Sequence, residues 1–231
     1  MKDGGRLNVL GFDTSGPVSA ACVLRADGEA FEHEPRPEAL AAAPAHAREL
    51  MPALARCLED AGVVFAELDA IAVGVGPGAF TGLRIGVTTS RALARASATQ
   101  LRPVSSLAAL AAGSGEPLSL PLIDAGRGEV FAAVFEDGRE RWPAFAAAPE
   151  SVAARVRQAG LDPLATGNGA VRFRDVLEAA GIRVATAGSG AHVVRGLSIC
   201  RLAAAAPATP PDAVLPDYLR FPDAKPILPD T

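Results

Sequence analysis

The sequence lacks any run of about 18 consecutive apolar residues, the length that a membrane-spanning helix needs. Its first residues lead into only a short apolar segment that already carries Asp13, which is unlike a signal peptide. We therefore expect no membrane segment and a cytoplasmic location. At 231 residues, of which 49% are hydrophobic and 21% charged, the chain is long enough to bury a substantial core.

Cysteine and histidine are also scarce. The cysteines are Cys22, Cys57 and Cys200, an odd number at wide spacing among apolar neighbours. That pattern argues against a disulfide framework or a zinc cluster, so we expect buried, unreactive thiols. The three histidines are too dispersed for a metal motif such as His-Glu-x-x-His. The sequence therefore predicts no metal site.

Acidic residues are absent from one long stretch. Between residues 70 and 115 there is no Asp or Glu, whereas Arg84, Arg91, Arg95 and Arg102 all fall there. This segment is locally cationic, although the net charge of −4 excludes a general polybasic nucleic-acid binder.

Residues 73–86 form the most distinctive motif of the sequence. Their pattern predicts a strand, a glycine-rich turn and a helix rich in small residues. Gly74, Gly76 and Gly78 allow positive φ or close backbone approach, and Pro77 stiffens the turn. Thr81 is a candidate cap for a helix over 81–96. Free amides at the start of that helix would favour an anion or a carbonyl.

Two nucleotide motifs fail at this turn. The P-loop pattern requires lysine and a hydroxyl residue where Leu83 and Arg84 follow Gly82. A formal match to the dinucleotide fingerprint over 74–79 lacks the acidic residue expected about 20 positions later.

Hydrolase signatures are absent too. There is no Gly-x-Ser-x-Gly elbow. Asp124 and Glu129 flank a tight turn, where such residues are usually structural. We assign no catalytic residue.

A β-hairpin is predicted at the start of the chain, with apolar runs over 7–12 and 18–24 and a polar turn between them. The carboxylate and hydroxyls of that turn can bond to their own backbone, or they can meet a nucleotide phosphate together with the glycine turn. The candidate phosphate contacts are Asp13, Thr14, Ser15, Gly76, Pro77 and Gly78.

Two helices in the first half have distinctive faces. A helix over 39–61 carries Leu50, Leu54 and Leu58 at four-residue spacing. The helix over 81–96 has a small face at Gly82, Gly86, Ser90 and Ala94, which permits close approach of another element. That face fits packing within the chain or docking of a partner.

Strands and helices continue to alternate in the second half, as in α/β or mixed α+β architecture. Strands are expected over 118–123 and 130–135, near 164 and over 182–184. Helices are expected over 106–113, 149–159, 170–180 and 191–205. The proline-rich tail from residue 207 should be extended, with Tyr218-Leu219-Arg220 as an anchor.

Four segments together resemble the TsaB (YeaZ) family. They are LGFDTS at 10–15, GPGAFTGLRIG at 76–86, DAGRGEV at 124–130 and PDYLR at 216–220. The resemblance implies an α/β fold of the actin-like ATPase type, shared with sugar kinases, with two related lobes. We expect lobes at 1–104 and 105–231, with the 191–205 helix and the tail packing back on the first lobe.

The resemblance also implies a function. TsaB proteins are non-catalytic companions of TsaD in forming threonylcarbamoyladenosine at position 37 of transfer RNAs that read codons starting with A. TsaD relatives carry a metal motif His-x-x-x-His after the equivalent helix, and Ser106 and Leu110 stand at those positions here. Leucine cannot coordinate a metal, so neither a metal, a cofactor nor a glycopeptidase activity is expected.

The leading hypothesis is therefore a scaffold that binds TsaD as a heterodimer, joins TsaE in a ternary complex, forms a homodimer when alone and involves transfer RNA only indirectly. An independent ATPase or kinase of the same fold is the alternative, with a glycopeptidase-like hydrolase a weaker one. The predicted partner contacts are His46, Leu50, Leu54, Leu58, Gly82, Arg84, Gly86, Ser90 and Leu93.

Overall fold

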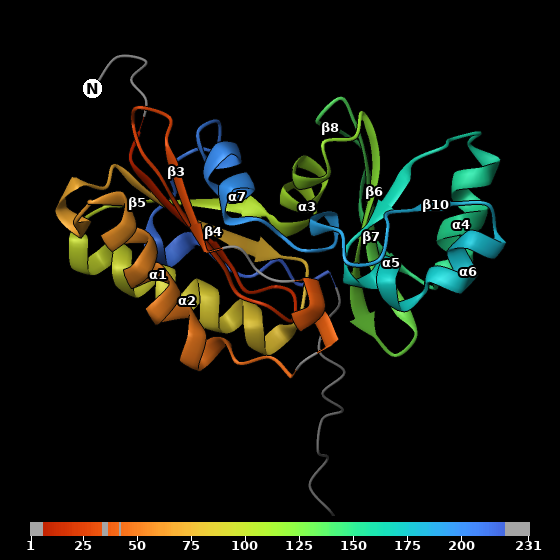
Figure 1. Cartoon of the computed structure of the whole chain (residues 1–231), viewed down its shortest axis with the longest axis horizontal. Coiled ribbons are helices and arrows are strands. Elements are labelled where there is room, and N and C mark those ends of the chain that lie inside the picture. The colour runs from red at the N-terminus through yellow and green to blue at the C-terminus, as the bar shows by residue number, and fades with distance from the viewer. Residues whose placement is uncertain (1–6, 34–36, 42, 220–231) are drawn as a thin grey trace, which may run out of the picture.

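The first sheet has five strands in the order β3-β2-β1-β4-β5 and lies on the left of Figure 1. The structure, a computed structural model, describes residues 7–33, 37–41 and 43–219. β1 and β2 form the predicted opening hairpin, β3 extends it antiparallel, and β4 and β5 run parallel to β1. The strands are β1 (Val9–Asp13), β2 (Ala20–Leu24), β3 (Ala30–His33), β4 (Ala70–Gly76) and β5 (Gln100–Ser105).

Both faces of this sheet are covered by helices. Leu10 and Phe12 belong to the core under α1 (His46–Ala61) and α2 (Phe80–Ser97), whereas Val9 and Cys22 belong to the core under α7 (Gly196–Ala203). Successive side chains of a strand point to opposite faces, which explains this division. Because β1 and β4 are buried on both faces, their sequences are nearly continuous apolar runs.

The second sheet repeats the topology of the first. Its order is β10-β9-β6-β7-β8, with β6, β7 and β8 antiparallel and β6, β9 and β10 parallel. β6 thus corresponds to β1, and β9 to β4. The strands are β6 (Leu118–Gly126), β7 (Glu129–Glu136), β8 (Arg139–Ala147), β9 (Leu164–Thr166) and β10 (Arg183–Val184). This duplication confirms the predicted pair of related α/β lobes.

The helices follow the same repeat. α4 follows β8 as α1 follows β3, and α5 and α6 stand between β9 and β10 as α2 stands between β4 and β5. α3 packs on Ile123 and Phe131 of the second sheet, whereas α7, from the end of the chain, packs on the first. α3 and α7 lie between the sheets (Figure 1). The helices are α3 (Ser106–Ser114), α4 (Pro149–Gln158), α5 (Asn168–Arg172) and α6 (Arg174–Ala179).

Polar contacts hold α7 at both ends. The Glu32 carboxylate, 7% exposed, accepts from the guanidinium of Arg195 and from the Leu197 amide at 3.1 Å. At the other end Arg102 Nη1 donates to the Ala203 carbonyl at 2.8 Å. These contacts attach the last helix firmly to the first lobe.

The chain then returns along α2 as a segment that we call the strap (residues 207–219). The Thr209 amide donates to the Leu101 carbonyl at 2.8 Å, and the Asp217 amide donates to the Val75 carbonyl at 2.7 Å. Val214 is buried in the core beneath α1 and α2. Apart from one 3-10 turn, η4 (Pro211–Ala213), the strap is extended as predicted.

Several local predictions were wrong. β8 was not expected, because Arg139, Glu140 and Arg141 give no apolar alternation; it is an edge strand with exposed side chains, where Pro143 is tolerated. α2 begins at Phe80 with Ala79 as its N-cap residue, so Thr81 lies in the first turn and does not cap it.

Helix boundaries also differ from the predictions. The region expected as one helix over 39–61 is a 3-10 turn, η1 (Pro37–Ala41), followed by α1, and the expected helix over 170–180 divides into α5 and α6 at Phe173. The last helix is preceded by η3 (Gly190–His192) and starts only at Gly196. One further 3-10 turn, η2 (Phe65–Glu67), precedes β4. No described helix combines the length and apolar character that crossing a bilayer requires.

Candidate functional site

The two most specific sequence motifs pack directly against each other. Four glycines at four-residue spacing, Gly74, Gly78, Gly82 and Gly86, surround the turn at residues 13–15, and we call them the glycine ladder. A Cβ added at any of the four would lie less than 3.0 Å from an atom of that turn. The glycines are therefore required because a side chain would displace the turn.

Both oxygens of the Asp13 carboxylate accept hydrogen bonds within this contact. One oxygen accepts from the Ser15 amide at 2.8 Å and the Ser15 hydroxyl at 2.7 Å, and the other accepts from the Ser106 hydroxyl at 2.6 Å. Ser106 Oγ in turn accepts from the Gly76 amide at 3.1 Å. Asp13 thus joins β1, the end of β4 and the start of α3.

Two further polar groups of the turn are paired, the Thr14 hydroxyl and the Ser15 carbonyl. Thr14 Oγ1 donates to the Gly82 carbonyl at 2.8 Å, and the Ser15 carbonyl accepts from the Ala79 amide at 2.8 Å. Asp13, Thr14 and Ser15 are at most 1% exposed. The side chains that the sequence assigned to a phosphate are therefore hydrogen-bonded within the chain and shielded from solvent. Gly76 and Pro77 are buried as well, and Gly78 is half-buried.

One small cavity lies between the lobes among the residues that the structure describes. A cavity of about 20 Å³ lies beside Asp13 and Ser15, where the two sheets face each other. That volume holds about one water molecule, far less than a nucleotide needs. Its other lining residues include Leu40, Leu110, Ile123, Asn168, His192 and Val194.

The two positions at which TsaD relatives carry metal-binding histidines hold Ser106 and Leu110 here. Ser106 is committed to Asp13, and Leu110 is buried in the core between α3 and the second sheet. Within residues 7–33, 37–41 and 43–219, no group of three or more His, Cys, Asp or Glu side chains could hold a metal ion.

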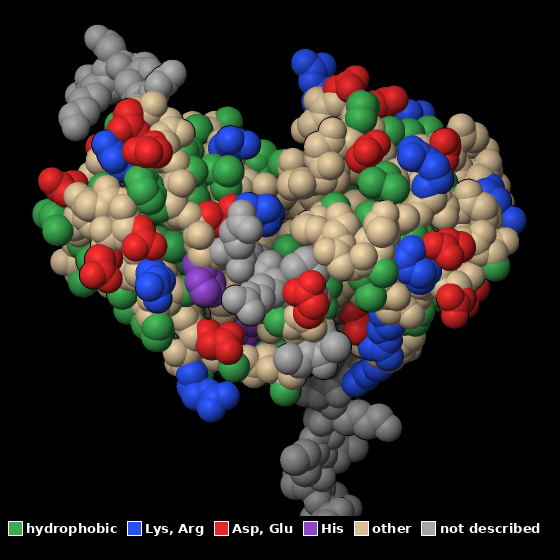
Figure 2. Space-filling view, viewed as in Figure 1, with side chains coloured by type: hydrophobic (Ala, Val, Ile, Leu, Met, Phe, Trp, Pro, Cys, Tyr) green, Lys and Arg blue, Asp and Glu red, His purple; other side chains and the backbone are tan. Residues whose placement is uncertain are grey.

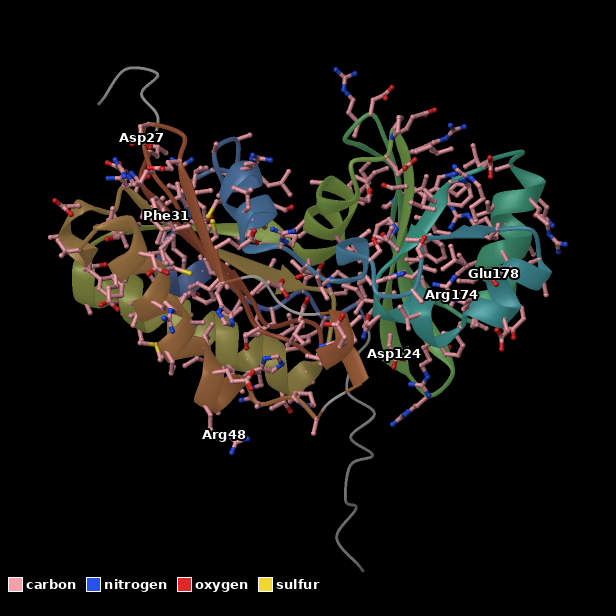
Figure 3. The ribbon with its side chains drawn as sticks, viewed as in Figure 1. Asp27, Phe31, Arg48, Asp124, Arg174 and Glu178 are labelled. Carbon is pink, nitrogen blue, oxygen red and sulfur yellow. The ribbon has the colours of Figure 1, made fainter. Side chains whose placement is uncertain are left out.

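The equivalent turn of the second lobe is open. Asp124 Oδ1 accepts from the Gly126 amide at 2.9 Å, and its other oxygen pairs with Arg172 at 2.5 Å, so the predicted structural role of Asp124 holds. Figure 3 shows Asp124 at the lower end of the second sheet. A Cβ at Gly126 or Gly128 would meet nothing within 4 Å. No glycine ladder covers this turn.

The predicted partner contacts on α1 are inside the protein. His46, Leu50, Leu54 and Leu58 are 3%, 2%, 0% and 7% exposed, and the three leucines pack on the first sheet. This corrects their assignment to a surface. An apolar stripe on an amphipathic helix has to cover its own sheet first, and it looks the same in the sequence as a docking stripe.

The small face of α2 is internal as well. Gly82 and Gly86 abut Thr14, and Ser90 is fully buried with its hydroxyl donating to the Val87 carbonyl at 2.8 Å. The sequence left two alternatives for this face, packing within the chain or docking of a partner, and the structure shows packing within the chain. Among the predicted contacts on α2, Arg84 is exposed and Leu93 is half-buried.

The outer faces of α1 and α2 are exposed to solvent, and together we call them the double-helix face. The two helices lie side by side on one face of the first sheet (Figure 1). Arg48 projects from α1 away from the protein (Figure 3), and Met51 is 47% exposed. Other exposed residues on this double-helix face are Pro52, Ala55, Glu59, Phe80, Thr81, Arg84, Thr88 and Ala92.

Sequence reasoning missed one residue on this face, Phe80, which is 47% exposed. Its ring lies 5.3 Å from that of Tyr218, and the Arg84 guanidinium lies 5.1 Å from its centre. A large aromatic residue within an otherwise small-residue segment was the available signal. Tyr218, the only tyrosine of the chain, belongs to the anchor predicted at 218–220. Leu219 packs against the core between α3 and the second sheet, and Arg220 lies outside the described residues.

His46 lies behind the Asp13–Ser15 turn. Its Nδ1 is 2.8 Å from Ser19 Oγ, and its Nε2 is buried without a hydrogen-bond partner. Burial lowers the pKa of His46 below the ordinary value of 6.5, outweighing the nearby Gly16 carbonyl and Asp13 carboxylate. His46 is therefore a buried neutral histidine at the start of α1.

The cysteines are buried and unpaired, as predicted. Burial raises the pKa of Cys57 to about 11 and that of Cys200 well above its ordinary value. Since the thiolate is the reactive form, both thiols are unreactive in the folded protein.

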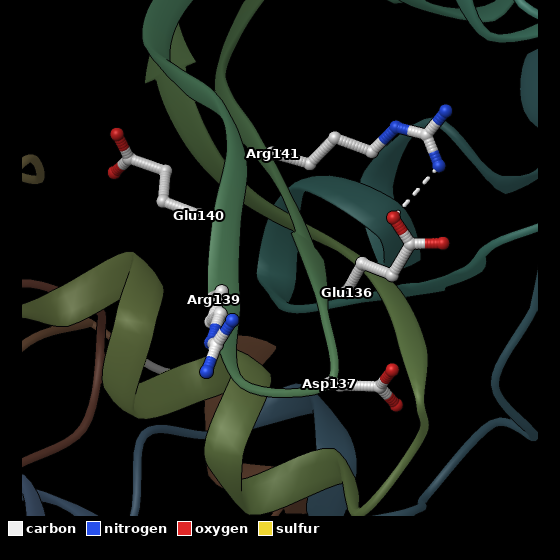
Figure 4. A pocket seen from close by; sticks show the side chains of 5 residues that line it. All are labelled: Glu136, Asp137, Arg139, Glu140 and Arg141. Carbon is white, nitrogen blue, oxygen red and sulfur yellow. Dashed lines mark hydrogen bonds and ion pairs between the residues drawn. The ribbon is translucent and has the colours of Figure 1, made fainter.

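A charged hollow of about 550 Å³ at the tip of the β7–β8 hairpin is a less convincing site (Figure 4). It is lined by Glu136, Asp137, Arg139, Glu140 and Arg141, with an ion pair of 2.8 Å between Glu136 and Arg141. These are exposed side chains on an edge hairpin, remote from both motifs. The face in Figure 2 likewise mixes acidic and basic side chains without a broad patch of either sign.

Comparison with known proteins identifies the family. The family model described as TsaD, tRNA N6-adenosine threonylcarbamoyltransferase, matches residues 37–229. The uncharacterized protein Rv3421c of Mycobacterium tuberculosis is 33% identical over 95% of this chain and 94% of its own length. The uncharacterized ML0378 of Mycobacterium leprae is 32% identical over 96% of this chain, which spans 57% of that longer protein.

Two named proteins are similar to the chain. The tRNA threonylcarbamoyladenosine biosynthesis protein TsaB of Bacillus subtilis is 33% identical over 56% of each chain. The solved structure of YeaZ from Pseudomonas aeruginosa has a TM-score of 0.73 and 29% identity, covering 92% of this chain and all of that one. The family match, the full-length structural likeness and the duplicated lobes agree, and the chain belongs to the TsaB (YeaZ) family.

Proposed function

We propose that this chain is a non-catalytic scaffold and activator of a TsaD-type threonylcarbamoyltransferase, acting in the formation of threonylcarbamoyladenosine on transfer RNA. The observation that carries the proposal is the closed Asp13–Ser15 turn. Its carboxylate binds Ser15 and Ser106, its Thr14 hydroxyl binds the Gly82 carbonyl and its Ser15 carbonyl binds the Ala79 amide, so these groups are engaged within the chain. We infer the pathway from the names of the similar proteins, both of which refer to threonylcarbamoyl modification of transfer RNA.

The partner surface of this proposal is the double-helix face. The glycine ladder brings α2 close to β1, and the leucine stripe of α1 fixes that helix on the sheet. Both helices are thereby held rigidly with their outer faces free, a preorganised surface that loses little entropy on binding. We propose that this surface packs against helices of the transferase subunit.

The wider assembly follows the same proposal. TsaE joins as a third component, the double-helix face supports a homodimer when the partner is absent, and transfer RNA is held mainly by the other subunits. The mixed charge of the face in Figure 2 and the net charge of −4 support indirect involvement of RNA. The expected location is the cytoplasm.

Reconstitution tests the proposal. Transfer RNA modification is measured with purified TsaC, TsaD and TsaE, with and without this chain. We expect modification to depend on the chain, and equal modification in its absence would overturn the role.

Variants must be placed on the outer face to test binding rather than folding, because Leu54 and Gly86 are buried. Ala55→Arg on α1 and Thr88→Arg on α2 are exposed positions, and we expect both to weaken co-purification with TsaD. Ala179→Arg, at an exposed position of α6 in the second lobe, is the matched control and should bind normally. Normal binding by all three would remove the double-helix face from the interface.

A further inference from the structure

The strap is anchored to the first lobe along its length. The Thr209 amide donates to the Leu101 carbonyl at 2.8 Å, at the edge of β5, and Val214 is buried in the core beneath α1 and α2. Farther on, the Asp217 amide donates to the Val75 carbonyl at 2.7 Å, where β4 ends. The strap thus reaches the carboxyl end of the first sheet, beside the glycine turn.

The last described residue of the strap contacts the other lobe. Leu219 is half-buried and packs against the core between α3 and the second sheet. The buried members of that core include Leu110 of α3, Ile123 of β6 and Phe131 of β7. One short segment is therefore attached to both lobes.

The same core forms part of the wall of the cavity between the lobes. Leu110 and Ile123 line this cavity of about 20 Å³, and Asp13 and Ser15 line it from the first lobe. Leu219 packs against the core that contains Leu110 and Ile123. The strap and the closed cavity are thus parts of one packed unit.

Two crossings of the chain join the lobes. The first leads from β5 into α3, where the Ser106 hydroxyl donates to Asp13 at 2.6 Å. The second leads from η3 into α7, where the two ring nitrogens of His192 lie 3.2 and 3.0 Å from the carbonyls of Gly167 and Ala185. Two connections still allow rotation about the line that joins them, so side-chain contacts between the lobes have to set the angle.

The two ends of the strap differ in the number of their anchors. On the first lobe Asp212 forms ion pairs with Arg91, at 3.1 Å, and with Arg95. These pairs add to the buried Val214 and to the backbone hydrogen bonds of the strap. On the second lobe the contact is made by the half-buried side chain of Leu219. Because one half-buried apolar contact is weaker than the combined anchors, the strap detaches from the second lobe first and stays on the first.

We propose that the strap is a latch, which holds the second lobe closed on the Asp13–Ser15 turn. Displacing Leu219 releases that lobe to rotate about the two chain crossings. The inference goes beyond the proposed function and does not depend on it, because the latch works within one chain and its test needs no partner.

Pulsed electron paramagnetic resonance on the full chain tests the latch. Spin labels at Glu59→Cys on α1 and Ala179→Cys on α6, both exposed positions, report the distance between the lobes, and the native thiols are buried. We expect Leu219→Asp to widen the distance distribution about twofold or more, because further lobe angles become populated. Leu219→Met keeps the apolar contact and should retain the narrow distribution. Leu215→Asp introduces the same charge at a strap position that is 65% exposed, and it should also leave the distribution unchanged.

The widths decide the inference. A wide distribution in Leu219→Asp, together with narrow ones in Leu219→Met and Leu215→Asp, supports the latch. Equal widths in all variants and the wild type overturn it. Equal widening by Leu215→Asp overturns it as well, because any charge added to the strap would then have the same effect.

Amide hydrogen exchange checks that the aspartate variant keeps its fold. In Leu219→Asp we expect peptides from α3 and β6 to exchange about tenfold faster and those from α1 and β2 to exchange at the wild-type rate. If all four elements exchange faster, Leu219→Ala takes the place of the aspartate variant in the distance measurement. A widened distribution in Leu219→Ala then supports the latch, and an unchanged one overturns it.

Discussion

The two lobes have the same strand order, but the turn after the first strand is buried in the first lobe and open in the second. In the first lobe residues 13–15 are buried under the glycine ladder, and the Asp13 carboxylate and the Thr14 and Ser15 hydroxyls are hydrogen-bonded. In the second lobe the Asp124 turn is open, with free space at Gly126 and Gly128.

The helices differ along with the turns. α1 and α2 have 16 and 18 residues, whereas α4, α5 and α6 have 10, 5 and 6. A closed turn and two long helices give the first lobe a rigid outer surface. The comparison teaches that one topology can bury the turn after its first strand or leave it open: Gly82 and Gly86 of α2 face the turn itself, whereas Gly167 and Gly169 at the start of α5 face Leu122 of β6, before the turn.

Adding one methyl group to the ladder should have the largest effect. In a helix interior Gly→Ala normally stabilises by about 0.5–1 kcal/mol. At Gly82 the new Cβ would overlap the Thr14 carbonyl, so we expect Gly82→Ala to destabilise by about 3 kcal/mol. Gly113→Ala in α3, where the Cβ would stand 3.4 Å from the nearest atom, should instead be neutral or stabilising. Urea unfolding of the two variants measures the contrast, and equal stability would refute the packing role of the ladder.

Removing the equivalent carboxylates of the two lobes should have a smaller, unequal effect. Asp13→Ala leaves the buried Ser15 amide and two hydroxyls without an acceptor, costing about 2 kcal/mol. Asp124 is part-exposed, so Asp124→Ala should cost about 1 kcal/mol or less. Thermal unfolding compares the two, and a larger loss for Asp124→Ala would reverse the proposed difference between the lobes.

Acid should destabilise the first lobe through His46. Burial depresses its pKa in the folded state, so the folded protein resists protonation. The stability contribution is complete above the unfolded pKa of 6.5 and is lost as the pH falls from there toward the lower folded pKa. His46→Gln should reduce the change in unfolding free energy between pH 7.5 and about pH 5 relative to the wild type. An equal change in the variant and the wild type would contradict the burial effect.

Thiol labelling should detect the smallest effects. All three cysteines lie in the cores around the first sheet, so they report on opening of that lobe. With a pKa of about 11, Cys57 is about one part in a thousand thiolate at pH 8. We expect no labelling of the native protein over the time in which the unfolded chain reacts fully, and more labelling in Gly82→Ala. Rapid native labelling would indicate a looser lobe.

Much of the architecture could be predicted from the sequence. The opening hairpin, the strand running through glycines into α2 and the alternation through α4 and β9 carry strong local signals, namely apolar runs, turn residues and helical spacing. β8 carried no such signal, because Arg139, Glu140 and Arg141 are solvated on an edge strand.

The candidate site was less predictable, because it depends on contacts between distant residues. The sequence marks Asp13–Ser15 and the glycine turn as special, but whether they hold a ligand or each other depends on tertiary packing. The four-residue spacing of Leu50 and Leu54 is equally typical of a helix that packs on its own core and of one that docks a partner. The pairing of Phe80 with Tyr218 depends on the path of the strap across 138 positions of sequence, which no periodicity encodes.

The central claim is that the first-lobe motif is closed on itself and serves docking rather than nucleotide chemistry. Titration of ATP with magnesium into the isolated chain, with release of inorganic phosphate followed in the same sample, tests it most directly. The account predicts no heat beyond dilution and no phosphate release. Stoichiometric binding with turnover, lost in Asp13→Ala, would contradict it.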